Sequence, residues 1–376
     1  MHLTKKVEHF LFESPTWKLL AVVCVLWLVK TGIWTYPNPP ALWAMAQNPF
    51  ANPFTNPDEE YVMWSWLSPW LAWLTGATTM PRLFALALAQ AVAFTFLFVR
   101  VTLNSLPRDL ARTAIVLFAM LPVSTTAYYW VGYDSLTLLL MMAVLAFPAA
   151  PLVTLGAGLL LGMQHFEQGF LGAAGLSAAL FLSRRQGYPL PYGLKFCLLL
   201  LGALVAGKLA LVGLFRHYDI HVASGRMVWV REHLGGLVSN FFLHAHAVVW
   251  SLLGLGWLAA ARFAEWGRRS LPFFLVLGAL GLLAVVTADQ TRVVAIVTFP
   301  LLMAYWLRNP DFLSRLARRE VALVFILWAV MPMSWVWLGV QKWSVFPYDV
   351  AYVLHQAFGW FALPDNLALW PFEPFR

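Results

Sequence analysis

Long apolar stretches separated by short polar segments set the pattern of this chain. Many of these stretches approach about 20 residues, the length at which a helix spans the hydrocarbon of a bilayer. We therefore predict an all-α, polytopic membrane protein with about eleven spans. The predicted spans are residues 17–35, 82–103, 112–131, 135–148, 151–163, 169–183, 194–214, 236–261, 271–288, 292–307 and 320–340. The fourth, fifth and sixth are short for a bilayer about 30 Å thick, which favours broken, tilted or re-entrant helices there.

The composition agrees with this pattern and excludes a soluble protein. The 376 residues are 61% hydrophobic and 11% charged, and they include 20 Trp and 28 Phe. Soluble domains carry about 25% charged residues, so this chain has too little polar surface to cover its apolar content. A disordered chain, a coiled coil and a disulfide-rich secreted scaffold are excluded as well. We treat residues 1–376 as a single transmembrane domain.

Basic residues gather in one alternating set of loops, which predicts the orientation of the chain. By the positive-inside rule, this set is cytoplasmic. Its members are Lys5, Lys6, Lys18, Arg108, Arg112, Arg184, Arg185, Lys195, Arg262, Arg268, Arg269, Arg308, Arg315, Arg318 and Arg319. The N-terminus is then cytoplasmic and the C-terminus lies outside. The net charge of +8 is spread over these short clusters rather than over a long basic run, so we predict no nucleic-acid partner.

The opposite side carries most of the acidic residues and seven of the nine histidines. Its larger segments are a first outer loop at 36–81, a second outer loop at 215–235 and a C-terminal tail at 341–376. A protein that gathers titratable groups at one face is expected to do its chemistry there. The alternative is that positive-inside selection alone enriches the outer loops in acids.

Three acidic residues mark the start of a predicted interfacial helix in the first outer loop. Several Asn-Pro steps precede them, and each proline biases the residue before it away from helix. Asp58, Glu59 and Glu60 then occupy the first turn after Pro57, where carboxylates meet the positive end of the helix dipole. A Trp-rich run follows, and Trp favours the membrane interface. The acids either cap this helix or include a general base that faces a membrane-embedded substrate.

A cytoplasmic N-terminus, a long first outer loop with an Asp-Glu pair and a following interfacial helix resemble the GT-C glycosyltransferases. In that superfamily, polytopic enzymes take sugars from polyprenyl-phosphate or polyprenyl-diphosphate donors at the outer face. The resemblance covers the layout of roughly the first half of the chain, and Asp58-Glu59 matches the acidic pair of the family. It implies that Asp58 is the catalytic base while Glu59 or Glu60 caps the helix, or the reverse. We assign Asp58 and Glu59 to catalysis and Glu60 to substrate binding.

The resemblance also implies the partners and the location of the protein. The donor is a polyprenyl-phosphate-linked sugar, the acceptor is a lipid or a glycan, and membrane lipids surround the chain. The transfer of a hexosyl or pentosyl group proceeds with inversion, because the base directs the acceptor in line with the leaving phosphate. Some relatives use a divalent metal, and Asp58, Glu59 and Asp134 are compatible with Mg²⁺ or Mn²⁺. The absence of any Asn-x-Ser/Thr sequon favours a bacterial inner membrane, with the site facing the periplasm.

Further polar residues at the predicted outer rim are candidates for substrate binding. Asp134 directly precedes a span, where it either caps the helix or positions the acceptor or a metal. Asp289 and Arg292 lie three residues apart between two spans. They either pair with each other or leave Arg292 to bind the lipid phosphate, because a guanidinium binds phosphate oxygens bidentately. In the second outer loop, Arg226 and Arg231 are competing candidates for that phosphate.

His165 and Glu167 belong to a polar island, Gln164–Gln168, between two apolar runs. They contact sugar hydroxyls or an acceptor amine, or they form a solvated turn. Two side chains are too few to predict a metal site.

Two other functions remain open. A polymerase or ligase of lipid-linked glycans would depend on Arg226 and Arg231. A secondary transporter or flippase would depend on groups near the middle of the membrane, such as Lys208 or His246.

Overall fold

The computed structural model describes residues 2–33, 39–57, 59–188, 190–222, 226–344, 346, 354–355 and 357–360. The predicted base Asp58 and most of the predicted outer tail, 341–376, lie outside these residues.

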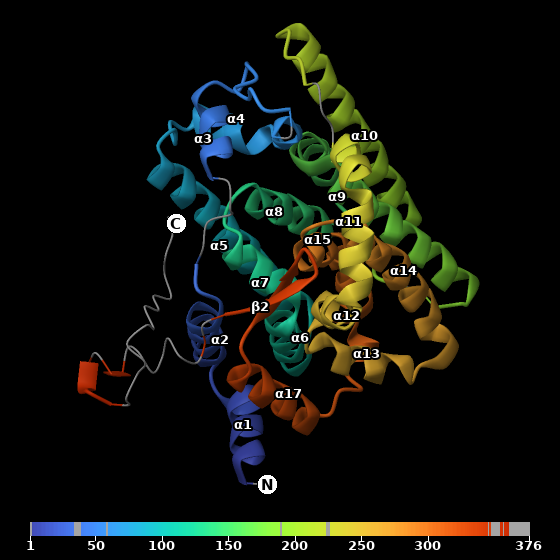
Figure 1. Ribbon diagram of the computed structural model, residues 1–376. Coiled ribbons are helices and arrows are strands. Elements are labelled where there is room, and N and C mark those ends of the chain that lie inside the picture. The colour runs from blue at the N-terminus through green and yellow to red at the C-terminus, as the bar shows by residue number, and fades with distance from the viewer. Residues whose placement is uncertain are drawn as a thin grey trace.

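Within the described residues, helices form nearly all of the regular structure, as predicted, and the strands form one short hairpin (Figure 1). The α-helices are α1 (His2–Glu13), α2 (Thr16–Thr31), α3 (Pro39–Gln47), α4 (Leu67–Leu74), α5 (Met80–Ser105), α6 (Arg108–Met120), α7 (Pro122–Tyr129), α8 (Tyr133–Ala146), α9 (Pro151–Arg185), α10 (Leu194–His217), α11 (Arg226–Leu243), α12 (Ala245–Leu253), α13 (Gly256–Ala264), α14 (Leu271–Gly281), α15 (Gln290–Leu302), α16 (Pro310–Leu313) and α17 (Arg318–Val330). The shorter helical segments are η1 (Glu60–Ser65), η2 (Gly267–Ser270), η3 (Leu282–Val285) and η4 (Met303–Leu307). The antiparallel strands are β1 (Ser334–Trp337) and β2 (Val340–Trp343).

In the part of the chain that the structure describes, four segments are helices long and apolar enough to cross a membrane: Met80–Ser105, Leu194–His217, Gly267–Val285 and Gln290–Leu307. Three bent helix pairs raise the number to seven if each pair is one span, and their bends are 117° for α1–α2, 58° for α6–α7 and 84° for α11–α12. These helices indicate a multi-pass membrane protein. The prediction of about eleven spans is wrong for the described residues, because four to seven are found.

Bends and merged helices account for the difference. The predicted spans 151–163 and 169–183 are one helix, α9, whose backbone leaves helical geometry at His165 (φ −159°, ψ 76°). The predicted span 320–340 ends as a helix at Val330, and the β1–β2 hairpin begins at Ser334. An apolar run therefore located each of these segments without revealing where its helix bends or ends.

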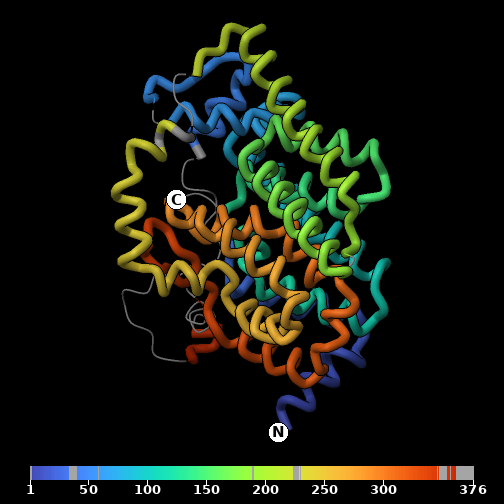
Figure 2. The backbone as a smooth tube through the Cα atoms, turned by 90° about the vertical axis from the view of Figure 1, so that its right-hand side faces the viewer, coloured from blue at the N-terminus to red at the C-terminus, as the bar shows by residue number. Residues whose placement is uncertain are grey.

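Helices α9 and α10 pack with their backbones in contact, and they run side by side in both views (Figure 1 and Figure 2). A Cβ added to Gly162 would lie 2.3 Å from the carbonyl oxygen of Leu204, and one added to Gly207 would lie 2.0 Å from that of Leu159. Small residues permit such close approach between membrane helices. The contact fixes the residue after Gly207, Lys208, against the kinked centre of α9.

One end of the molecule is held together around α1, which contacts α17 and α6 at the lower end of the view in Figure 1. Arg318 donates to Glu13 at 2.8 Å and to Asp109 at 2.5 Å. The buried Arg112 donates to the backbone carbonyl of Leu11 at 2.6 Å. Arg112 and Arg318, which the charge pattern assigns to one side of the membrane, thus both anchor α1. Helices α3 and α4 lie at the opposite end (Figure 1).

Candidate functional site

A buried ionic cluster joins the starts of α8 and α15. Arg292, in the first turn of α15, donates from Nη2 to Asp289 at 2.6 Å and from Nη1 to Asp134 and to the hydroxyl of Tyr133, the latter at 3.2 Å. The Asp134 side chain is 3% exposed and that of Arg292 is 12% exposed. The pairing of Asp289 with Arg292 is confirmed, and Asp134 joins it as a second carboxylate. Two carboxylates around one guanidinium leave the cluster with a formal charge of −1, which disfavours a bound phosphate.

A second cluster surrounds the kink of α9. Glu167 lies with one oxygen 3.6 Å from His165 Nδ1 and with the other 3.7 Å from Lys208 Nζ. The Lys208 ammonium lies 3.6 Å from the ring centre of Trp64, a residue of η1 in the first outer loop. The helix breaks at His165, and just beyond the break Glu167 faces Lys208 of α10. The polar island is therefore packed against other elements and is no solvated turn.

Gln164 links the two clusters. It is fully buried, its Oε1 accepts from the backbone N–H of Ser68 in α4 at 2.8 Å, and its Nε2 donates to the carbonyl of Tyr133 at 2.8 Å. Tyr133 directly precedes Asp134 in α8. The first outer loop, the kink of α9 and the ionic cluster thus meet through one side chain, which the sequence analysis placed in the polar island without assigning it a role.

The acidic stretch of the first outer loop leads into a turn and a 3-10 helix. The 3-10 helix η1 begins at Glu60, and α4 follows it from Leu67. Glu60 is buried and Glu59 is exposed. The helix predicted to start directly after Pro57 therefore begins later. Asp58, which was predicted to act in catalysis together with Glu59, lies outside the described residues.

Of the two predicted arginines of the second outer loop, Arg231 lies apart from both clusters. Arg231 is exposed on α11, which runs along the edge of the molecule (Figure 2). Arg226 begins that helix, and its side chain lies outside the described part of the chain. Within the structure as described, none of the contacts that build the two clusters involves Arg231.

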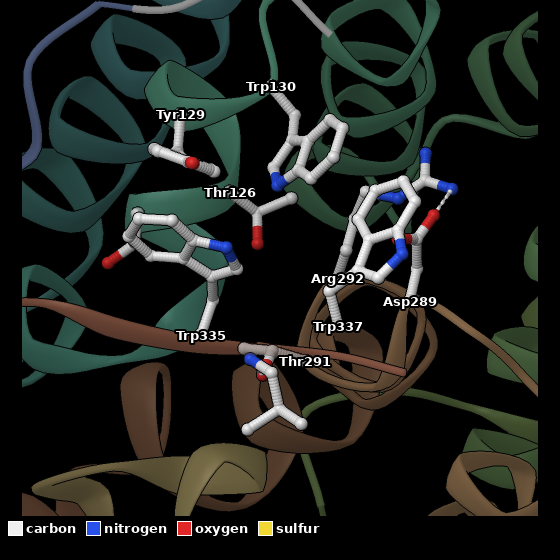
Figure 3. Close-up of a pocket in the computed structure, with 10 residues that line it drawn as sticks. Thr126, Tyr129, Trp130, Asp289, Thr291, Arg292, Trp335 and Trp337 are labelled. Atoms are coloured by element: carbon white, nitrogen blue, oxygen red, sulfur yellow. Dashed lines mark hydrogen bonds and ion pairs between the residues drawn. The ribbon is translucent and has the colours of Figure 1, made fainter. Parts of the chain in front are cut away.

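A small aromatic pocket adjoins the ionic cluster and was missed by the sequence analysis (Figure 3). Trp130 stacks on Trp337 with ring centres 5.2 Å apart, and the ring of Tyr129 lies 3.7 Å from that of Trp335. Two of these rings come from the end of α7 and two from β1. The signal was present as alternating Trp residues in 334–337, but it lay at the end of an apolar run interpreted as one span.

Three backbone hydrogen bonds fasten the hairpin to the start of α15. Val336 donates to the Thr291 hydroxyl at 2.8 Å, Gly339 donates to the side chain of Gln290 at 3.3 Å, and Leu338 donates to the carbonyl of Ala288 at 2.8 Å. Leu338 and Gly339 both adopt positive φ, at 49° and 77°, which gives the tight turn of a two-residue hairpin. The aromatic pocket and the ionic cluster therefore share one rigid support.

A metal centre is not assembled by the residues that the structure describes. Among them, no group of three or more His, Cys, Asp or Glu side chains lies close enough to hold an ion. Of the three carboxylates considered for Mg²⁺ or Mn²⁺, Asp134 is engaged by Arg292 and Glu59 is exposed.

No protein-family model, curated protein or solved structure matches this chain. A functional assignment therefore rests on the sequence and on the geometry of the two clusters.

Proposed function

We propose that this protein is an inverting membrane glycosyltransferase of the GT-C type, which moves a sugar from a polyprenyl-phosphate donor to an acceptor at the outer face. The observation that carries the proposal is the convergence of charged and polar side chains from α8, α9, α10 and α15 beneath the first outer loop. Charged groups in membrane helices are costly and mark functional sites. Most of the other buried side chains in the bundle are apolar.

The reaction needs one base and one cation. Asp58, with Glu59 beside it, takes the proton from the acceptor hydroxyl. The acceptor oxygen then bonds to the anomeric carbon, while the bond from that carbon to the phosphate oxygen breaks and its electron pair leaves with the phosphate. Attack opposite the leaving group inverts the configuration. The phosphate leaves without a general acid when a cation stabilises its charge.

Lys208 is the cation best placed for the phosphate. Its ammonium is shared with Glu167 at 3.7 Å, whereas Arg292 is held by two carboxylates at hydrogen-bond distance. An ammonium binds phosphate as a point charge and needs no fixed fork of donors. In this assignment, His165 and Glu167 contact the acceptor, and Arg292 positions Asp134 and Asp289 for sugar hydroxyls.

The charge pattern supports the orientation within this proposal. The α1 end, with Arg112 and Arg318, is cytoplasmic, and the end that carries α3 and α4 faces the periplasm of a bacterial inner membrane. Arg231, on which a glycan polymerase or ligase would depend, is exposed on α11 and apart from the clusters, so the geometry favours the transferase.

The test is transfer by the full-length protein in lipid nanodiscs. The probes are synthetic polyprenyl phosphates that carry radiolabelled mannose, glucose, galactose or arabinose, with total membrane lipid and glycan extracts as acceptors. Asp58→Asn and Lys208→Met should each abolish product, and Asp219→Asn is the control for the loss of one carboxylate, because the Asp219 side chain is exposed and has no part in the proposed reaction. Full activity of Asp58→Asn and Lys208→Met would show that neither the proposed base nor the proposed phosphate contact is needed, and it would refute the proposal. Solute flux in proteoliposomes that depends on Lys208 but not on Asp58 would favour a transporter.

A further inference from the structure

Two kinds of arginine are found at the α1 end of the molecule. Arg262 of α13 pairs with Glu320 of α17 at 3.0 Å, and Arg318 bridges two carboxylates. The first pair places α13 beside α17, toward the lower end of the view in Figure 1. Among the described residues, Arg269 and Arg315 form no ion pair with a carboxylate, although both are exposed.

Arg269 and Arg315 lie against aromatic rings instead. The guanidinium carbon of Arg269 lies 5.8 Å from the ring centre of Tyr188. That of Arg315 lies 4.8 Å from the ring centre of Trp266. The two rings meet edge to face with their centres 5.5 Å apart, so the four side chains form one cluster. A ring holds a guanidinium in place but, unlike a carboxylate, does not neutralise it.

The two rings of this arginine–aromatic cluster are fixed by the core beneath them. Tyr188 is buried, and its hydroxyl accepts from Nδ2 of Asn309 at 2.7 Å. Trp266 packs on Phe263 with ring centres 5.1 Å apart and on Phe312 with ring centres 6.2 Å apart. The arginines are therefore exposed cations on a rigid base.

The charge around the cluster is positive. Burial raises the pKa of the Tyr188 hydroxyl, whereas Arg269 and Arg315 lower it, so both guanidiniums act at this ring. The Asp311 carboxylate raises the same pKa, but it is exposed and forms no ion pair with either arginine in the described part of the chain. Arg268, beside Arg269, is exposed as well. One carboxylate among three arginines leaves an excess of positive charge.

The cluster lies where candidate membrane spans begin and end. The span Gly267–Val285 begins in the turn that carries Arg269, and Gln290–Leu307 ends shortly before Arg315. Tyr and Trp favour the boundary between the hydrocarbon and water, which is also where lipid headgroups lie. A ligand of these arginines is therefore expected in the headgroup layer.

We propose that the arginine–aromatic cluster binds the phosphate of an anionic phospholipid. A guanidinium donates two parallel hydrogen bonds to phosphate oxygens, and basic pockets between the ends of membrane helices bind anionic headgroups. A zwitterionic phospholipid carries the same phosphate, but its own cation is repelled by the arginines. This site goes beyond the proposed sugar transfer and does not depend on it.

The test compares lipid binding by the full-length protein and its variants in detergent. Native mass spectrometry gives the apparent Kd of the first bound phosphatidylglycerol and of the first phosphatidylcholine with the same acyl chains. Phosphatidylglycerol should bind about tenfold more tightly. Arg269→Gln and Arg315→Gln should each weaken its binding about fivefold and leave phosphatidylcholine binding unchanged. Arg269→Lys, which keeps the charge without the planar fork, should recover part of the loss.

Arg262→Gln is the matched control for the loss of one positive charge at the same end of the molecule. Because Glu265 and Glu320 already pair with Arg262, its replacement should change the affinity for phosphatidylglycerol about twofold or less. Unfolding midpoints in detergent that match the natural protein establish that the variants are folded.

Several outcomes would overturn the lipid site. Equal affinity for the two lipids would remove the role of charge, and an equal loss from Arg262→Gln and Arg269→Gln would mean that binding follows net charge alone. Displacement of the lipid by an equal concentration of glycerol phosphate would identify a soluble phosphate compound as the ligand, and displacement by polyglutamate would identify an acidic protein. Sugar transfer enters none of these measurements, so the lipid site and the transferase succeed or fail separately.

Discussion

Arg318 and Arg292 each bridge two carboxylates, and their surroundings differ. Arg318 joins Glu13 and Asp109 near α1, with its side chain 47% exposed. Arg292 joins Asp134 and Asp289 between α8 and α15, with its side chain 12% exposed. Each bridge joins one guanidinium to two carboxylates, and the main difference between the two is burial.

The comparison shows where a charge network is structurally costly. Water and salt screen the bridge at Arg318, and exposed ion pairs contribute little to stability. At Arg292 water is largely excluded, so removal of one partner leaves the others as uncompensated buried charges. Such a buried network adds little net stability to a protein, although breaking it is costly. This is why the proposed function gives the network a part in substrate binding.

The largest expected effect comes from breaking the buried bridge. Arg292→Met leaves Asp134 and Asp289 facing each other without a cation, and we expect a loss of about 3–5 kcal/mol in the free energy of unfolding. The measurement is the midpoint of SDS-induced unfolding in mixed micelles. Arg292→Lys, which keeps the charge but loses the planar fork, should recover part of the loss. Equal stability of Arg292→Met and the natural protein would contradict the burial argument.

The next effect tests the backbone contact that supports the Lys208 cluster. Gly207→Ala places a Cβ 2.0 Å from the carbonyl oxygen of Leu159, so α9 and α10 must separate, at a cost of about 3 kcal/mol. Gly202→Ala is the matched control on the same helix, because an added Cβ there meets no atom within 4 Å. Both are compared by SDS-induced unfolding, and similar midpoints for the two would show that the close packing of α9 on α10 is unimportant.

A smaller loss is expected from uncoupling the first outer loop. Gln164→Leu removes both hydrogen bonds of the buried amide and leaves the Ser68 N–H without its acceptor, which costs about 2 kcal/mol, whereas the Tyr133 carbonyl keeps the hydrogen bond from the Thr137 hydroxyl. Faster hydrogen exchange in η1 and α4 would locate the change. Gln168→Leu on the same helix is the control, because its Oε1 has no hydrogen-bond partner among the described residues. Loop exchange that is the same in both variants would speak against Gln164 as the link.

The smallest effect should come from the exposed bridge. Arg318→Met is expected to cost at most about 1 kcal/mol, and the difference from the natural protein should shrink further as salt is raised. The measurement is the same unfolding midpoint at low and high ionic strength. A loss as large as that of Arg292→Met would mean that burial does not distinguish the two bridges.

The sequence predicted the class of the fold because apolar runs and scarce charges leave little choice. It could also predict that Asp289 and Arg292 pair, since they are separated by three residues on one helix. It could not predict that Asp134 completes the cluster, because 158 positions separate it from Arg292 and only the packing of α8 against α15 joins them. Contacts of this range depend on the fold and leave no local pattern.

The predicted number of spans was wrong for a related reason. Hydropathy measures how apolar a segment is and carries no information about the direction in which its backbone runs. The break of α9 at His165 and the turn into β1 after Val330 keep the segment apolar while changing its course. The aromatic pocket went unnoticed because its Trp residues lie in that second segment, where they resemble the interfacial end of a span.

The close packing of α9 on α10 has a consequence for the membrane itself. Helix α10 has 24 residues and is about 36 Å long, whereas the hydrocarbon layer is about 30 Å thick, so a spanning α10 fits when it is tilted. Because the backbone of α10 packs directly against that of α9, a change in the tilt of α10 moves both helices together. The depth of Lys208 and Glu167 is therefore set by the thickness of the lipid around them, and a thinner or thicker bilayer would raise or lower the cluster relative to the lipid headgroups.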